Sequence, residues 1–271
     1  MKQGAHSTLE ATTPGRSRPS PNLLVAHLSH FVSLSKDDIS FLETLCEKQE
    51  RVQKAVNLAE EGDAPSRGFA ICRGLACRYR DMPDGRRQIL TFIMPGDFFG
   101  LHAFLMKSID YSIIAMTPTR LARIEQAQLI EIVEHHPRIV TALWCHTMQE
   151  AALLRERVVR LGRGNAHIRV AYLFCEFLWR YRAVGLGEDD TLWMPLTQAE
   201  IADTLGLTPV HVNRVLQDFR RDGVITLAQR RLTLHRVDRL QELAQLNQDY
   251  LHLTGIPRAG ERLLERLAPG R

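Results

Sequence analysis

The chain has no run of apolar residues that approaches the roughly 18–20 residues of a membrane span. Its N-terminus also lacks the apolar core of a secretory signal peptide. Residues 1–20 are instead rich in Ser, Thr, Pro, Gly and Arg, and we predict a disordered arm there. These absences favour a cytoplasmic protein with no membrane partner.

Cysteine is scarce and scattered. The five cysteines are odd in number, and no Cys-x-x-Cys is present. We therefore expect a reduced cytoplasm, and a cysteine-held iron–sulfur cluster is not indicated. Cys72 and Cys77 could be neighbours across a turn between strands. We favour two small buried side chains, with a redox-sensing pair as the alternative.

The overall composition excludes little. A length of 271 residues fits one large domain or two ordinary ones, and an apolar content of 45% is enough for a core. The net charge of +4 is only a weak indication of a nucleic-acid partner. Local patterns are more informative.

Two helix-start signals lie close together in the C-terminal third. Thr197, followed three residues later by Glu200, forms a capping box that predicts a helix, and Gly206 permits the positive φ that ends it. Thr208 can cap a second helix with Pro209 at its first position, where no amide donor is missed. Two short helices joined by a tight glycine turn predict a helix-turn-helix.

The outward side of the second predicted helix suits a DNA major groove. Arg pairs with guanine and Asn with adenine, each pair being worth roughly 1–3 kcal/mol of discrimination, and an apolar side chain can touch a thymine methyl. The alternative is an ordinary helical hairpin with a polar face. The residues that we expect to contact bases are Val210, His211, Asn213 and Arg214.

Charge around these helices is one-sided. Between residues 207 and 236 there are six Arg and two Asp, an excess that is expected for phosphate contact. Two alternating apolar runs, residues 224–227 and 232–234, predict a β-hairpin wing beside the helices. The side chains that we expect to contact phosphate are Thr197, Thr208, Gln217, Arg220 and Arg230.

From residue 50 to 124 the apolar period changes to that of β-strands. Turn signals at Met82–Gly85 and Met94–Asp97 separate short alternating runs. Many short strands at regular spacing predict a barrel, jelly roll or sandwich. Helices are expected around it, over residues 23–31, 36–47 and 126–135.

An apolar stripe with coiled-coil period follows, from residue 137 to 163. Its positions step alternately by four and three residues, which predicts a parallel dimer; a long helix packed on its own sheet is the alternative. Gly162–Gly164 is expected to break the helix and act as a hinge. The expected dimer seam is Val140, Trp144, Thr147, Ala151, Leu154, Val158 and Leu161.

Three further segments have helical patterns. Residues 167–181 predict a helix with a buried face, and residues 237–253 predict an amphipathic helix that covers either the helix-turn-helix or the dimer. Residues 254–271 carry another short helical pattern with Leu residues, and the sequence does not indicate where this segment packs.

A β-roll, a long dimer helix and a C-terminal winged helix-turn-helix, in that order, resemble the CRP/FNR regulators over about residues 22–236. The motifs that carry the resemblance are Pro95-Gly96-Asp97-Phe98-Phe99-Gly100, Leu196-Thr197-Gln198-Ala199-Glu200-Ile201-Ala202, and Thr208 to Leu216 followed by Arg221-Asp222-Gly223-Val224-Ile225. The chain is similar to a branch without the family's cyclic-nucleotide and iron–sulfur motifs.

The resemblance implies an α+β fold in five segments. They are a disordered arm (1–21), a β-roll sensor domain similar to cyclic-nucleotide-binding domains (22–136), a dimerisation helix with hinge (137–163), a winged helix-turn-helix (164–253) and an extension of unknown role (254–271).

The function that the resemblance implies is sequence-specific transcription regulation rather than catalysis. A homodimer would bind near-palindromic double-stranded DNA, the β-roll would sense an effector, and RNA polymerase would be a partner of an activator. One alternative is a regulator of the same fold without an effector, controlled by abundance or thiol oxidation. A cupin-type enzyme would need a His/Glu metal cluster on the strands, and none is visible between residues 50 and 124.

At the DNA, the chain departs from the family's better-known members at one position. Arg214 matches the family's arginine that reads a guanine. Val210 stands where those members carry a glutamate that accepts a hydrogen bond from cytosine. Because valine cannot accept a hydrogen bond, we expect a different base preference there, with a thymine methyl as one option.

The expected sensor pocket departs as well. Residues 100–112 contain no Arg to hold a phosphate, and Asp110 would repel one. We therefore expect no cofactor and no tight cyclic AMP binding. The residues expected to line the pocket are Gly96, Asp97, Gly100, His102, Tyr111 and Ser112.

Histidines suggest no metal site in the sequence. His102 lies close to where carbon-monoxide-sensing relatives place a haem ligand, so haem is a minor alternative to a surface histidine. His135, His136 and His146 are interpreted as residues of solvated helix faces, without a metal.

Overall fold

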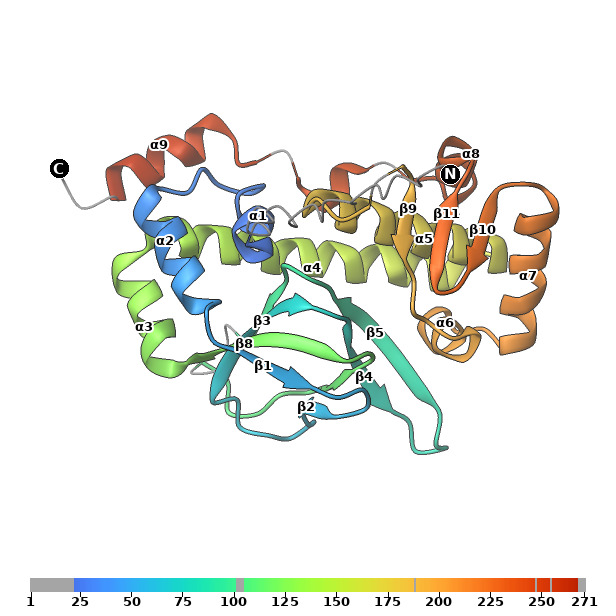
Figure 1. Ribbon diagram of the computed structural model, residues 1–271, viewed down its shortest axis with the longest axis horizontal. Coiled ribbons are helices and arrows are strands. Elements are labelled where there is room, and N and C mark those ends of the chain that lie inside the picture. Colours follow the sequence, from blue (N-terminus) through green and yellow to red (C-terminus); the bar gives the residue numbers. More distant parts are fainter. Residues whose placement is uncertain (1–21, 101–104, 188, 247, 254, 268–271) are drawn as a thin grey trace, which may run out of the picture.

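Residues 22–100, 105–187, 189–246, 248–253 and 255–267 are described by the computed structural model. The predicted arm and His102 lie outside these residues. The 27-residue helix α4 (Pro137–Arg163) runs along the molecule between a sensor half with the β-sheets and a half with the winged helix (Figure 1). None of the helices described is long and apolar enough to cross a membrane.

The sensor half begins with two capped helices. Asn22 caps α1 (Leu23–Leu28) through its side-chain oxygen, and the helix ends three residues earlier than predicted. Ser35 and Asp38 form the capping box of α2 (Lys36–Leu45), so this predicted start is confirmed. Both helices pack with Phe31 and Val32 in a core shared with α4.

The predicted β-rich region is a roll of two antiparallel sheets with strand orders β1-β8-β3-β6 and β2-β7-β4-β5. The sequence did not indicate the short strands β2 and β6. The hairpin β4–β5 turns at Met82–Gly85 as predicted. The strands are β1 (Gln49–Val52), β2 (Asn57–Ala59), β3 (Arg67–Arg73), β4 (Ala76–Asp81), β5 (Arg87–Ile93), β6 (Phe98–Phe99), β7 (Ser112–Ala115) and β8 (Thr119–Glu125).

Three helices follow the roll. Helix α3 (Gln126–His135) has the predicted bounds, and α4 ends at Arg163 with Gly164 as its C-cap, within the predicted break at Gly162–Gly164. Helix α5 (Ala166–Ala183) is buried from Val170 to Tyr181. Arg169 fixes the turn between α4 and α5, because its guanidinium donates to the carbonyls of Leu161 and Gly164 at 2.8 and 2.9 Å.

The second half is a winged helix-turn-helix. Helix α6 (Gln198–Leu205) ends at Gly206, whose φ of +60° confirms the predicted stop. Helix α7 (Pro209–Arg221) follows, and then the wing strands β10 (Ile225–Ala228) and β11 (Arg231–Leu234). The sequence did not indicate β9 (Thr191–Trp193), which pairs with β11 as the third strand of this sheet.

The two halves share one core. The cluster that contains Phe92 of β5 and Phe177 of α5 continues into the buried faces of α6 and α7. Helix α6 lies next to β5, where Gln88 Nε2 donates to the carbonyl of Thr204 at 3.3 Å (Figure 1). The helix-turn-helix therefore rests on the sensor roll in this conformation.

The C-terminal segment differs most from expectation. The helix predicted over 237–253 is divided at Gln245, whose φ is +51°, into α8 (Val237–Ala244) and the 3₁₀ helix η1 (Gln248–Leu251). The chain then returns to the sensor half as α9 (Arg258–Leu267), beside α2 (Figure 1). There Glu261 pairs with Arg138 of α4 at 3.2 Å, and Leu264 is buried.

Candidate nucleic-acid interface and internal cavity

Helix α7 presents one apolar and one polar face. Thr208 accepts a hydrogen bond from the His211 amide at 3.3 Å, and Pro209 occupies the first helical position, as predicted. Its inward residues Val212, Val215, Leu216 and Phe219 are buried against α5 and α6. The other side of the helix faces solvent at the end of the molecule away from α9 (Figure 1).

Three of the four expected base-contact residues are exposed. Val210 is 76% exposed, and His211 and Arg214 are exposed as well. Within the described part of the chain, Arg214 makes no ion pair, so its guanidinium is available. Asn213 is half-buried and donates from Nδ2 to Gln198 Oε1 of α6 at 3.1 Å. Its amide therefore holds the two helices together.

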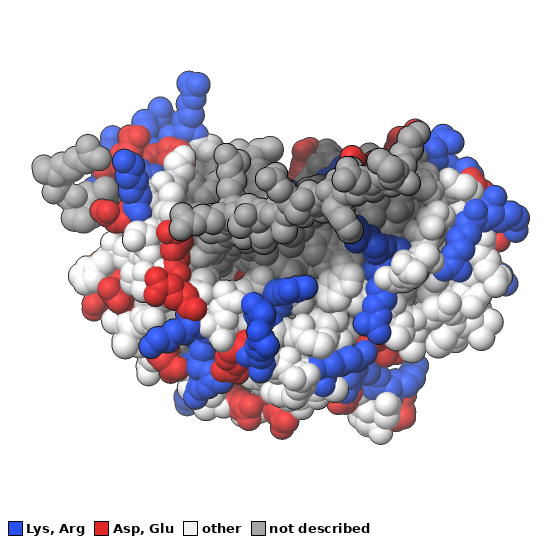
Figure 2. All heavy atoms as spheres, viewed as in Figure 1, with Lys and Arg blue, Asp and Glu red and all other residues white. Residues whose placement is uncertain are grey.

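The expected phosphate contacts surround this helix. Thr197 and Thr208 lie at the N-termini of α6 and α7, where amide groups and the helix dipole favour an anion. Arg220 donates to the carbonyl of Leu227 at 3.3 Å, while Gln217 and Arg230 are exposed. Lys and Arg side chains are visible at this end of the molecule (Figure 2).

Helix α4 carries an uncovered apolar stripe on the side opposite its buried residues. Trp144 is 66% and Val158 is 68% exposed, and Thr147 and Leu154 are exposed with them. Ala151 and Leu161 are half-buried. Val140 is half-buried too, but packs with the core of α1 and α2, so the exposed stripe begins at Trp144.

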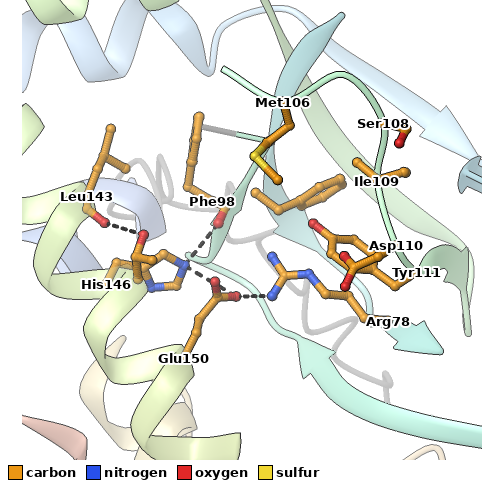
Figure 3. Close-up of a pocket in the computed structure, with 13 residues that line it drawn as sticks. Arg78, Phe98, Met106, Ser108, Ile109, Asp110, Tyr111, Leu143, His146 and Glu150 are labelled. Carbon is orange, nitrogen blue, oxygen red and sulfur yellow. Dashed lines mark hydrogen bonds and ion pairs between the residues drawn. The ribbon is translucent and has the colours of Figure 1, made fainter. Parts of the chain in front are cut away.

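A cavity of about 290 Å³ lies between the roll and α4 (Figure 3). Of the residues expected to line a sensor pocket, Gly100 and Tyr111 line this cavity. Gly96, Asp97 and Ser112 do not line it: the first two lie in a buried turn against α1 and α5, and the Ser112 hydroxyl accepts from the Glu61 amide. The lining is Arg78, Phe98, Phe99, Gly100, Met106, Ser108, Ile109, Asp110, Tyr111, Leu143, His146, Thr147 and Glu150.

An arginine that the sequence did not single out reaches this cavity. Arg78 of β4 is paired with Glu150 of α4 at 2.5 Å, and its guanidinium lies over the Tyr111 ring (Figure 3). Asp110 adds a second carboxylate to the lining. The positive charge of Arg78 is therefore already compensated by Glu150 in this structure.

The two glycines of the Pro95–Gly100 motif are needed by the backbone. A Cβ on Gly96 would lie 2.7 Å from the carbonyl of Leu23, and one on Gly100 would lie 2.6 Å from that of Arg67. Both residues have positive φ, near +95°. This motif therefore docks α1 and β3 closely and positions Asp97.

A buried charge network joins the roll to the winged-helix half. Asp97 Oδ2 accepts from Arg180 of α5 at 2.5 Å, and Arg180 also donates to Glu176 at 3.2 Å. Glu176 accepts in turn from Arg157 of α4 at 2.9 Å. Charged side chains within the otherwise apolar segment 167–181 were the available sequence signal for this network.

Two histidines differ from their sequence interpretation. His146 is buried rather than solvated: its Nε2 is 2.9 Å from the Phe98 carbonyl and its Nδ1 is 3.0 Å from His27 Nε2. His136 is half-buried, stacks on Phe41 and contacts Asp38 at 2.9 Å. Only His135 of the three is exposed.

The expected neighbours Cys72 and Cys77 belong to different sheets. Cys72 of β3 has Cys46 as its hydrogen-bonding neighbour, and this contact lowers the pKa of the Cys46 thiol and raises the pKa of the Cys72 thiol. Burial raises the pKa of Cys77 to about 12. The thiol that neighbours Cys72 is thus that of Cys46, and Cys77 lies in the other sheet.

The fold and these surfaces define a DNA-binding regulator, and comparisons with known proteins identify its family. Residues 49–136 match the cyclic nucleotide-binding domain family, and residues 168–243 match the Crp-like helix-turn-helix family. The nitrogen fixation regulation protein FixK of Bradyrhizobium diazoefficiens is 30% identical over 68% of this chain and 76% of its own. The chain belongs to the CRP/FNR family of transcription regulators and is not an enzyme.

Further relatives agree with this assignment. The transcriptional activator protein FnrL of Cereibacter sphaeroides is 31% identical over 63% of this chain and 69% of its own. The structure of FixK2 from Bradyrhizobium japonicum has a TM-score of 0.66 and 25% identity, covering 74% of this chain and 98% of that one. TTHB099, a CRP-family regulator of Thermus thermophilus, shares the fold, with a TM-score of 0.57 and 24% identity over 73% and 97% of the two chains.

Proposed function

We propose that the protein regulates transcription in the cytoplasm as a homodimer that reads near-palindromic DNA. The α4 stripe from Trp144 to Val158 supports the dimer, because an exposed apolar row with heptad spacing is buried when two such helices pair. Two α7 helices then enter successive major grooves about 34 Å apart. This geometry requires half-sites one helical turn apart.

The observation that carries the DNA-reading proposal is the exposed face of α7. Arg214 is exposed and unpaired with any described carboxylate, and Val210 and His211 lie one turn before it on the same helix. An unpaired guanidinium at this place suits the O6 and N7 acceptors of guanine. Asn213, which is held by Gln198, would act mainly by fixing the angle between α6 and α7.

Selection of duplexes from a random pool, followed by affinity measurement on the selected site, tests this proposal. Replacing Arg214 by Ala should weaken binding by about 10- to 100-fold and remove the preference at one base pair of each half-site. Arg51→Ala, which removes an equal charge from exposed strand β1, is the matched control and should bind normally. Equal affinity of wild-type and Arg214→Ala protein would reject the proposal.

For regulation, we propose that the cavity of about 290 Å³ is the sensor site. Glu150 and His146, one turn apart on α4, face the cavity (Figure 3). A ligand that displaces Glu150 would move α4 relative to the Asp97–Arg180 pair, and so relative to α5 and the winged helix. Such differential binding would shift the population between two domain arrangements.

We also propose that this cavity does not bind cyclic AMP tightly. Arg78 is compensated by Glu150, and Asp110 is a further carboxylate at the site, so a cyclic nucleotide phosphate would lack a free guanidinium. We expect titration calorimetry to detect no cyclic AMP binding at micromolar concentrations. Micromolar affinity would overturn this expectation. Haem also remains outside the proposal, since His102 lies outside the described residues.

Contact with RNA polymerase belongs to the proposal for an activator. FnrL and the AadR protein of Rhodopseudomonas palustris carry names that describe transcriptional activation. A template with the selected site upstream of a core promoter, transcribed with and without the protein, tests the direction of regulation. More transcript would support an activator, and less would indicate a repressor.

A further inference from the structure

The geometry points to a binding site for one divalent transition-metal ion, formed by His27, Asp97 and His146. The ligand atoms of these three side chains lie within 4.8 Å of one another, and all three residues are buried. They come from three separate parts of the chain: α1, the β5–β6 turn and α4. Metal binding there is a property of the isolated protein and does not depend on DNA recognition.

The spacing of the ligand atoms suits one ion. His27 Nε2 is 3.0 Å from His146 Nδ1 and 3.8 Å from Asp97 Oδ1. Bonds of about 2.0–2.2 Å to a common ion place adjacent ligand atoms about 3–3.5 Å apart. The two separations at His27 are close to this range, and all three ligand atoms lie within 4.8 Å of one another, so the side chains must rotate and move closer together to surround one ion.

Contacts behind the ligands hold them in the required states. The Phe98 carbonyl accepts from His146 Nε2 at 2.9 Å, which leaves the lone pair on Nδ1, the ring edge away from the cavity (Figure 3). Asp97 Oδ2 accepts from the Met94 amide and from Arg180, so Oδ1 is left facing His27. Hydrogen-bonded outer partners of this kind are typical of metal sites.

His27 can supply the third ligand without a net proton change. In the present arrangement its Nε2–H donates to His146 Nδ1. The neutral ring can instead carry the proton on Nδ1 and offer Nε2 to the ion.

The donor set identifies the class of ion. Two imidazoles and one carboxylate suit zinc or iron(II), with further positions left for water or a small ligand, whereas Mg²⁺ and Ca²⁺ prefer oxygen donors alone. The charges nearby are paired, with Arg78, Arg157 and Arg180 set against Glu150, Glu176 and Asp97. The ion's affinity would therefore come from the imidazole ligands more than from net negative charge.

Zinc uptake by chelator-treated full-length protein tests the site. After the chelator is removed and zinc is added, we expect one Zn²⁺ per chain to remain bound after dialysis. Cobalt-loaded protein should show no thiolate charge-transfer band, because no cysteine is a ligand. Replacement of His27 or of His146 by Gln should weaken zinc binding by at least about 100-fold, since loss of even an outer partner costs 10- to 100-fold. His135→Gln, on an exposed histidine, is the control and should bind as wild type.

A second measurement tests the metal site even if the histidine variants misfold. X-ray absorption of zinc-loaded wild-type protein needs no substitution and should show two imidazoles with oxygen and no sulfur. Failure of the wild-type protein to retain zinc, or retention that survives both histidine substitutions, would overturn the assignment. In that case His27, Asp97 and His146 form a hydrogen-bonded trio only.

Discussion

At the scale of single residues, we expect Val210 to make the base preference of the half-site differ from that of the better-known members. Its side chain is the most exposed apolar group of α7 and has no hydrogen-bonding capacity. Arg214 is exposed one turn further along the same helix, so we expect this face of α7 to make one specific polar contact and one apolar contact with the bases.

Substitution of Val210 by Glu tests this interpretation. A carboxylate at this position can accept from the N4 amino group of cytosine, so we expect the selected half-site to gain a cytosine preference of roughly 1–3 kcal/mol. Site selection with the variant measures it. Val210→Leu, which stays apolar, should keep the wild-type preference; an unchanged consensus for Val210→Glu would show that this residue does not reach a base.

Cysteine chemistry is also settled residue by residue. Burial raises the pKa of Cys77 and of Cys175 to about 12. At pH 8 a thiol of that pKa is thiolate in only roughly one molecule in ten thousand, compared with about a quarter for an ordinary thiol. Iodoacetamide should therefore label neither residue in the folded protein and both in urea, as read by peptide mass spectrometry. Rapid labelling of either in the folded state would contradict the burial.

At the scale of elements, local signals in the sequence predicted most helix ends. The capping residues Ser35, Thr197 and Thr208 each begin a helix in the structure, and Gly206 ends one, because capping depends on groups within a few residues. The break at Gln245 was not predictable in this way. A non-glycine residue with positive φ is held there by tertiary contacts, among them Arg160, which donates to its carbonyl.

Short strands escaped prediction for a related reason. Strands β2, β6 and β9 have two or three residues each, too few for a period to show. Their pairing partners, such as Phe69 for Phe99 and Leu232 for Leu192, are distant in sequence. These strands are therefore specified by pairing with distant strands, which no local pattern shows.

Helix α4 provides the test of dimerisation. Val158 is 68% exposed toward the C-terminal end of the expected seam, so Val158→Asp would bury two carboxylates between paired helices. We expect the variant to sediment as a monomer where the wild type is a dimer, and to lose tight operator binding. Val133→Asp, at an apolar site on α3 that is 51% exposed, should leave the mass unchanged. A dimeric Val158→Asp protein would place the interface elsewhere.

At the scale of the whole molecule, the sequence predicted the order of domains but not how they meet. The resemblance to the CRP/FNR family covered the roll, α4 and the winged helix. Contacts between them, such as Arg180 with Asp97 or His27 with His146, join residues 83 and 119 positions apart. No local pattern encodes such pairs, which is why the cavity lining and the histidine cluster were missed or only partly predicted.

The place of α9 leads to a prediction for the whole chain. Leu264 is only 3% exposed and fills the core of α1, α2 and α4, although it follows the winged helix in sequence. Leu264→Ala should lower the free energy of unfolding by about 2–5 kcal/mol. Glu265→Ala, at the adjacent exposed position, should change it little. Urea denaturation followed by tryptophan fluorescence measures both, and equal stability of the two variants would show that α9 does not dock.

The return of α9 has a mechanical consequence. A DNA-binding domain attached by a single connection can rotate over a wide range of directions. The winged helix of this protein is attached at two points. One is the turn after α4 that Arg169 holds, and the other is α9, which packs on the sensor half. A domain attached at two points can rotate only about the axis that joins them. This restriction favours two defined orientations of the winged helix over a continuous range.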